Sequence, residues 1–111
     1  MHITINNQEY QLATTLRVAY EVQGMNNHQA YTKVFERIGD MTLEEQIGIL
    51  YAAFRVGNPD QAKFIKQNDF LNSYLDTYTL SDLLAQLKEL INYIMGNNPD
   101  VEVAQESDVK N

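Results

Sequence analysis

Few residues in this chain have the types and spacing that catalysis or metal binding requires. Cysteine is absent and the two histidines, His2 and His28, share no ligand spacing, so a zinc site is not indicated. Glu44 and Glu45 are adjacent, but acids at a helix start are favoured by the helix dipole, and the pair is more typical of that position than of a catalytic dyad. No nucleophile arrangement accompanies His28, and no calcium loop or phosphate-binding glycine motif occurs. We therefore expect a protein without enzymatic activity, cofactor or metal.

The charge balance argues against nucleic acid as a partner. The chain has eight Lys and Arg against fifteen Asp and Glu, a net charge of −7, whereas binding a phosphate backbone needs clustered bases. Such a charge is compatible with a basic protein partner or with imitation of nucleic acid. The sequence has no run of about eighteen apolar residues and no secretory leader, so we expect no membrane partner and a location in the cytosol.

Aromatic residues are the most informative group. Seven tyrosines and four phenylalanines occur, and tyrosine is enriched at protein interfaces because its ring can be buried while its hydroxyl remains solvated. They either line an ordinary helical core or belong in part to a partner-binding surface.

The elements that position these residues begin with a β-hairpin over residues 3–12. Ile3 and Ile5, then Tyr10 and Leu12, alternate with the period of a half-buried strand. Asn6-Asn7 between them suits the left-handed conformation of a tight turn. An isolated two-stranded ribbon is only marginally stable, so the hairpin must pack on the rest of the chain.

Helical spacing of apolar residues predicts the remaining elements. We expect helices over 16–23 and 28–38, and a third that begins after Thr42, where Thr42 and Glu45 form a capping box, and ends at Gly57. Residues 60–78 predict two short helices, the second capped by Asn68 or Asp69. The last helix follows Thr79, which with Asp82 three residues on resembles a second capping box, and Gly96 closes it.

The third helix is apolar nearly all round, and such a helix is either buried centrally or meets a partner. One stripe runs through Ile47, Leu50, Tyr51 and Phe54, and a second lies on another side of the helix. We predict that the second stripe, together with nearby aromatic residues, binds a partner. The predicted partner-binding residues are Ile49, Ala53, Val56, Tyr51, Phe54 and Tyr74.

These elements predict a mainly α-helical fold with an N-terminal β-hairpin, a small bundle of about five helices. Residues 1–96 form a single domain. Residues 97–111 carry a net charge of −3 and no aromatic residue, so we expect a disordered, flexible acidic tail.

The order of the motifs ITINNQEYQL, LRVAYEV and IGILYAAFRVG resembles the small tail assembly chaperones of long-tailed phages and prophages of Gram-positive bacteria. That family often begins with a TING-x-EY-x-L ribbon, followed by LR and an LYAAL-like helix. Asn7 departs from the glycine that is usual in the turn. The matching residues are Thr4-Ile5-Asn6, Glu9-Tyr10, Leu12, Leu16-Arg17 and Leu50-Tyr51-Ala52-Ala53.

The resemblance implies a non-enzymatic chaperone. It would bind and shield the long apolar tape measure protein in the host cytoplasm before the tail tube polymerises, and would be absent from the mature virion. Two alternatives remain: an acidic regulator or nucleic-acid mimic that binds a basic protein, and a structural tail or head–tail component. Exposed apolar surface would also favour self-association.

The family also often makes a longer product by programmed ribosomal slippage. The chain ends with Lys110 and Asn111, and Lys-Asn is encoded by a slippery A-AAA-AAC or A-AAA-AAU tract. By this resemblance, residues 97–111 would tether a second domain, present only in the frameshifted form, that contacts the tail tube protein.

Overall fold

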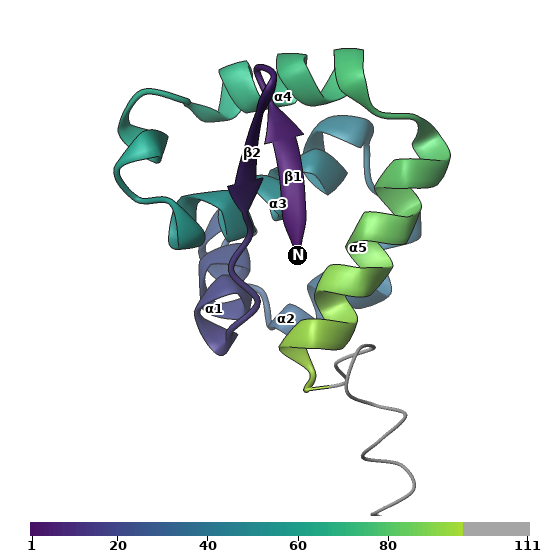
Figure 1. Ribbon diagram of the computed structural model, residues 1–111. Helices are drawn as coiled ribbons and strands as arrows, with labels where there is room; N and C mark the ends of the chain where they lie inside the picture. Colours follow the sequence, from purple (N-terminus) through teal and green to yellow (C-terminus); the bar gives the residue numbers. More distant parts are fainter. Residues whose placement is uncertain (97–111) are drawn as a thin grey trace, which may run out of the picture.

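The computed structural model describes residues 1–96, and the predicted disordered tail over 97–111 lies outside them. The described chain is mainly helical and opens with a two-stranded antiparallel hairpin, as the sequence predicted (Figure 1). Its elements are β1 (His2–Ile5), β2 (Gln8–Gln11), α1 (Leu16–Met25), α2 (Tyr31–Glu36), η1 (Ile38–Asp40), α3 (Leu43–Gly57), η2 (Gln61–Lys63), α4 (Gln67–Thr77) and α5 (Leu80–Ile94).

The hairpin turns at Asn6 and Asn7, which have φ angles of 53° and 64°. Both are left-handed, as the two-residue turn requires, and Ile3 pairs with Tyr10 across the strands. Helix α4 supports β1: the Tyr78 hydroxyl accepts a hydrogen bond from Thr4 N at 2.9 Å, and the Ser73 hydroxyl accepts one from Asn6 N at 2.9 Å. The ribbon thus gains from α4 the support that it lacks alone.

The chain leaving β2 is held against the end of α3. Ala13 N donates to the Ala53 carbonyl at 3.0 Å, and Asn58 Nδ2 donates to the Gln11 carbonyl at 2.8 Å. A Cβ at Gly57 would lie 2.9 Å from both Ala13 N and the Gln11 carbonyl oxygen. Only glycine allows this approach of two backbones.

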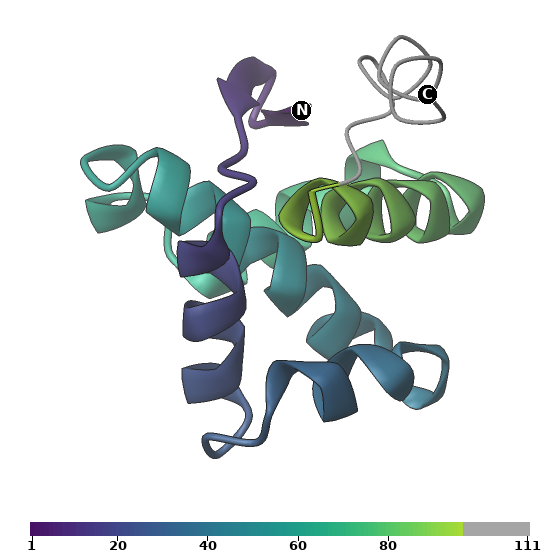
Figure 2. The same cartoon turned by 90° about the horizontal axis from the view of Figure 1, so that it is seen from below.

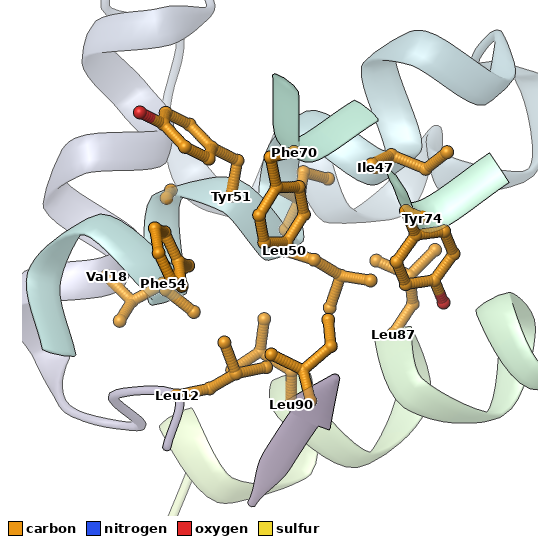
Figure 3. Close-up of a cluster of buried hydrophobic side chains, with 14 of the residues drawn as sticks. Leu12, Val18, Ile47, Leu50, Tyr51, Phe54, Phe70, Tyr74, Leu87 and Leu90 are labelled. Atoms are coloured by element: carbon orange, nitrogen blue, oxygen red, sulfur yellow. The ribbon is translucent and has the colours of Figure 1, made fainter. Parts of the chain in front are cut away.

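Helix α3 runs through the middle of the molecule (Figure 2), and every residue from 46 to 54 is buried. Phe54 lies at the centre of an aromatic cluster, with ring centroids 5.2 Å from Tyr10, 5.8 Å from Tyr51 and 5.3 Å from Phe70. Figure 3 shows three of these rings, those of Tyr51, Phe54 and Phe70, beside aliphatic side chains from α3, α5 and the segment after β2. Of the two alternatives for the third helix, central burial is therefore the one observed.

Both predicted capping boxes are present. At α3, Glu45 N donates to the Thr42 hydroxyl at 3.1 Å and Thr42 N donates back to the Glu45 carboxylate at 2.9 Å. At α5, Asp82 N donates to the Thr79 hydroxyl at 3.2 Å, and Thr79 N donates to the Asp82 carboxylate at 2.9 Å. Each box satisfies two backbone donors that a helix start otherwise leaves unpaired.

Several predicted boundaries were wrong. Helix α1 continues through Gly24 to Met25, and α2 begins only at Tyr31, because Asn27 and His28 adopt left-handed conformations that a helix excludes. Helix α4 begins at Gln67. Its N-cap is therefore Lys66, and not Asn68 or Asp69 as predicted. Asp69 instead lies in the first turn, where its carboxylate accepts a hydrogen bond from Lys66 N at 3.1 Å. Gly96, with φ of 87°, follows α5 as predicted.

Candidate functional site: an apolar groove beside helix α5

The residues predicted to bind a partner do not form an accessible surface. Ile49, Ala53, Tyr51, Phe54 and Tyr74 are all buried. They belong to the core because α1, α4, α5 and β2 together surround α3. In this structure the five side chains are therefore not available to a partner, and their role in binding stays a prediction.

Val56, the remaining predicted residue, is only partly buried. It lines a shallow hollow with Arg17, Glu21, Arg55 and Pro59, where Arg55 and Glu21 form an ion pair at 2.7 Å. The possible frameshift residues, Lys110 and Asn111, lie outside residues 1–96.

The two buried tyrosines of that set are held by hydrogen bonds within the chain. The Tyr51 hydroxyl donates to the Ile65 carbonyl at 2.9 Å, and the Tyr74 hydroxyl donates to Gln86 Oε1 at 2.7 Å. Burial raises the pKa of both phenols. Both therefore remain protonated at neutral pH, and their contacts connect parts of the core.

Accessible apolar surface lies instead where three helix ends meet. Leu43 in the first turn of α3, Leu75 near the end of α4 and Leu80 at the start of α5 are exposed, Leu80 by 61%. They border a cavity of about 280 Å³, which we call the α5 groove. Its lining residues are Leu43, Ile47, Tyr74, Leu75, Tyr78, Thr79, Leu80 and Leu83.

Local structure fixes the shape of this groove. The capping box at Thr79 starts α5 directly after α4, so the chain turns sharply between the two helices (Figure 1). Leu75 and Leu80, on either side of this turn, both line the groove. Ile47, Tyr74 and Leu83 are buried and form the floor. Exposed leucines above a buried apolar floor form the kind of surface that binds an apolar side chain.

A second hollow continues the apolar surface along α5. It has a volume of about 250 Å³ and its lining residues are Phe35, Ile38, Leu84, Leu87, Lys88, Ile91 and Asn92. Leu80, Leu84 and Ile91 share one helical face through their spacing, which spans roughly 16 Å at 1.5 Å per residue. Leu84 is 48% exposed, so the face is open between the two hollows.

Smaller apolar sites occur elsewhere. Leu16, Tyr20 and Tyr31 border a cavity of about 170 Å³ on α1 and α2, and the Arg17 guanidinium lies 5.4 Å from the centre of the Tyr20 ring. Phe64 is exposed in the segment between α3 and α4. Substitutions at these exposed positions can serve as controls for substitutions in the α5 groove.

The sequence analysis missed the α5 groove although a signal for it was present. Apolar residues on α5 occupy two sets of positions, 83, 87, 90 and 94 in one and 80, 84 and 91 in the other. A single buried stripe needs only one set. Leu43 and Leu75 carried no comparable signal, because their role depends on which helix ends come together.

Neither a cluster of potential metal ligands nor a membrane-spanning helix occurs in the part of the chain that the structure describes. Residues 1–96 contain no group of three His, Cys, Asp or Glu side chains that could hold a metal ion. None of their helices has the length and apolar character that a membrane span requires.

Comparisons of this chain with protein-family models, with curated proteins and with solved structures find no match.

Proposed function

We propose that this protein is a non-enzymatic phage tail assembly chaperone that binds and shields the tape measure protein. The observation that carries the proposal is the α5 groove, an open apolar surface on an otherwise well-packed small bundle. A helix of the tape measure protein would lay its apolar face into this groove, as amphipathic helices do in other helix-in-groove complexes. The motif resemblance at the hairpin, α1 and α3 supports the same assignment.

The packing of the interior supports binding at the exposed surface of the bundle, and not binding that requires the core to open. Within residues 1–96, no buried side-chain nitrogen or oxygen lacks a hydrogen-bond partner. Opening the core to expose α3 would break satisfied contacts, whereas Leu80 and Leu84 are accessible without any rearrangement. A rigid bundle with an exposed groove loses little conformational entropy on binding.

The net charge supports the proposal that the chaperone keeps the tape measure protein dispersed. At −7 the chaperone repels other copies of itself, and a tape measure protein coated with it would stay dispersed in the host cytoplasm. Release before the virion is complete rests on the motif resemblance alone, because the proteins of that family act before the tail tube polymerises.

Co-expression with the tape measure protein encoded in the same genome tests the proposal. We expect the tape measure protein to be soluble with the wild-type chaperone and largely insoluble with the Leu80→Ser/Leu84→Ser variant. Both substitutions remove apolar surface from the open face of α5 and leave the core intact.

Leu16→Ser is the matched control, because Leu16 is also an exposed leucine but lies on α1. It should preserve solubility of the tape measure protein. Equal insolubility with and without the wild-type chaperone would reject the function. A failure of Leu16→Ser alone would move the binding site to α1.

The salt dependence of the complex separates this proposal from the acidic-mimic alternative. Apolar shielding should persist at high ionic strength, whereas a complex held mainly by charge dissociates as salt screens it. Loss of the complex in about 0.5 M NaCl would favour the mimic.

A further inference from the structure

The segments that build the α5 groove carry acidic residues and no basic ones. All of its lining residues come from residues 38–54 and 67–87. The acids in these segments are Asp40, Glu44, Glu45, Asp69, Asp76 and Asp82, and every Lys and Arg of the chain lies outside both. The groove is therefore built from two segments whose charged residues are all acidic, with Arg37, Arg55, Lys66 and Lys88 directly flanking them in the chain.

Two of these acids are already used within their own helices. Glu45 and Asp82 accept hydrogen bonds from Thr42 N and Thr79 N, which lower the pKa of both carboxyls and keep them ionised at neutral pH. Acids in the first turns of α3 and α5 also offset the positive partial charge of those helix N-termini.

Glu44 and Asp76 are exposed, and each is adjacent in the chain to a lining residue, Leu43 or Leu75. They act on a bound partner through their field, which extends about 10 Å at 0.1 M salt. Glu44 itself lines a neighbouring hollow with Glu45 and Met25, so its effect on the groove does not need direct contact.

Two of the bases that flank these segments are placed by their own contacts, and one of them, Arg37, also helps to lower the pKa of the Glu45 carboxyl. Lys88 lines the second hollow, at the other end of the open face of α5. Arg37 is turned toward other residues, donating hydrogen bonds to Gln29 and Asn26 at 3.2 Å each. The open face thus has an acidic end at Leu75 and Leu80 and a basic residue at its far end.

We infer that the occupant of the α5 groove is an amphipathic helix whose apolar stripe is flanked by Lys or Arg at the end that meets Leu75 and Leu80. Apolar residues at positions i, i+3 or i+4 and i+7 of that helix contact the exposed leucines, and its bases lie in the field of Glu44 and Asp76. The inference rests on the proposed function and specifies which helices of the tape measure protein are bound.

Charge disfavours the two other occupants of this surface. Residues 97–111 of the same chain carry −3 and a second copy carries −7, so each would bring like charge to an acidic groove. Like-charge juxtaposition in an interface is strongly unfavourable, whereas opposite charges speed encounter and fix orientation.

Binding of synthetic peptides to the full chain tests the inference. The probes are two fluorescein-labelled amphipathic peptides of about 16 residues, long enough to form a helix when bound, with the same leucine stripe. Lysines flank the stripe in one peptide and glutamates in the other. We expect fluorescence anisotropy to show at least about tenfold tighter binding of the lysine peptide at low salt, with the difference shrinking as salt rises.

Two double variants, each of which reverses two charges, test whether the preference for the lysine peptide depends on the acids beside the groove. Glu44→Lys/Asp76→Lys should weaken binding of the lysine peptide by about three- to tenfold, mainly through a slower association rate. The helix-dipole effects of these two changes oppose each other, at the start of α3 and the end of α4, so the fold should be retained. Glu9→Lys/Asp60→Lys makes the same change in net charge at exposed positions on β2 and beside η2, and should leave the affinity within about twofold.

The outcomes separate the inference from the proposed function. Equal affinity for both peptides, or equal weakening by the two double variants, overturns the inference even if the tape measure protein is solubilised. Preference for the lysine peptide that depends on Glu44 and Asp76 supports it even if the tape measure protein proves not to be the partner. Concentration-dependent dimerisation that is lost in Leu80→Ser/Leu84→Ser and blocks the lysine peptide would assign the groove to a second copy and also overturn it.

Discussion

Helices α3 and α5 are alike in sequence and different in their environment. Each has fifteen residues, each begins with a threonine capping box, and each is rich in apolar residues. Yet α3 buries all of residues 46–54, whereas the buried residues of α5 are Leu83, Leu87 and Leu90. Helix α3 packs against α1, α4, α5, β2 and η2, while α5 packs mainly against α3 and α1 and contacts α4 through Tyr74. Apolar content alone therefore does not identify which helix presents a binding surface.

The difference follows from the position of each helix in the bundle. A helix in the centre has neighbours on every side, so even the small residues Gly48, Ala52 and Ala53 are buried and allow close packing. A helix at the edge buries one face, and additional leucines remain in solvent. In this protein the edge helix supplies the accessible surface, and the central helix holds the bundle that presents it.

The largest effect should come from removing a ring at the centre. Phe54→Ala deletes a fully buried side chain on α3 that contacts three other rings, so it should lower the free energy of unfolding by about 3–5 kcal/mol. Leu84→Ala, on the open face of α5, should cost under about 1 kcal/mol. Urea unfolding followed by circular dichroism measures both, and similar losses would contradict the contrast in burial between the helices.

The next effect concerns the contact between the hairpin and α3. Gly57→Ala places a Cβ 2.9 Å from two backbone atoms of residues 11 and 13. Since neither is the end of a flexible side chain, the variant should lose about 1–3 kcal/mol of stability. Gly24→Ala in α1 is the matched control: its Cβ meets nothing within 4 Å, and the gain in helix propensity should stabilise the protein by up to about 1 kcal/mol. An unchanged melting temperature for Gly57→Ala would mean that the two backbones leave room for a Cβ at this position, which would contradict the prediction.

Loss of either capping box should be smaller and, unlike the core change, equal for the two helices. Thr42→Ala and Thr79→Ala should each reduce the free energy of unfolding by about 1 kcal/mol, because a cap acts within its own first turn whatever the burial of the helix behind it. Thr42→Ser and Thr79→Ser retain the hydroxyl and should restore stability. A cost at α3 several times that at α5 would show that the cap is coupled to the core.

The smallest effect is the acid dependence of these caps. The pKa of Glu45 lies below its ordinary value of 4.5 and that of Asp82 below 3.8, in each case first because of the backbone N–H of the capping threonine. A carboxyl whose folded-state pKa is lowered contributes stability above its ordinary pKa and loses it as pH falls through the lowered value. Glu45→Gln and Asp82→Asn should therefore weaken the loss of stability that unfolding curves show below about pH 4.5. An unchanged pH profile in both variants would contradict this assignment.

The sequence predicted elements well where a local signal specified them. The Asn6-Asn7 turn, the Thr42 and Thr79 boxes and the glycine after α5 each depend on residues a few positions apart, and all are confirmed. The start of α2 was misplaced because nothing local marked His28 as left-handed. The burial of five predicted partner-binding residues could not be predicted for a different reason. Burial depends on which other elements pack against a helix, and residue spacing on that helix does not show this.

By itself, the sequence determined the fold class, the hairpin with its register and the starts of α3 and α5, because these follow from backbone conformation and from neighbours within one turn. Tertiary structure alone decided that α3 lies at the centre and α5 at the edge, and hence that Leu43, Leu75 and Leu80 meet around one groove. The physical reason is that exposure of an apolar side chain is a property of the packed assembly of helices. The exposure of a residue therefore does not follow from its type alone.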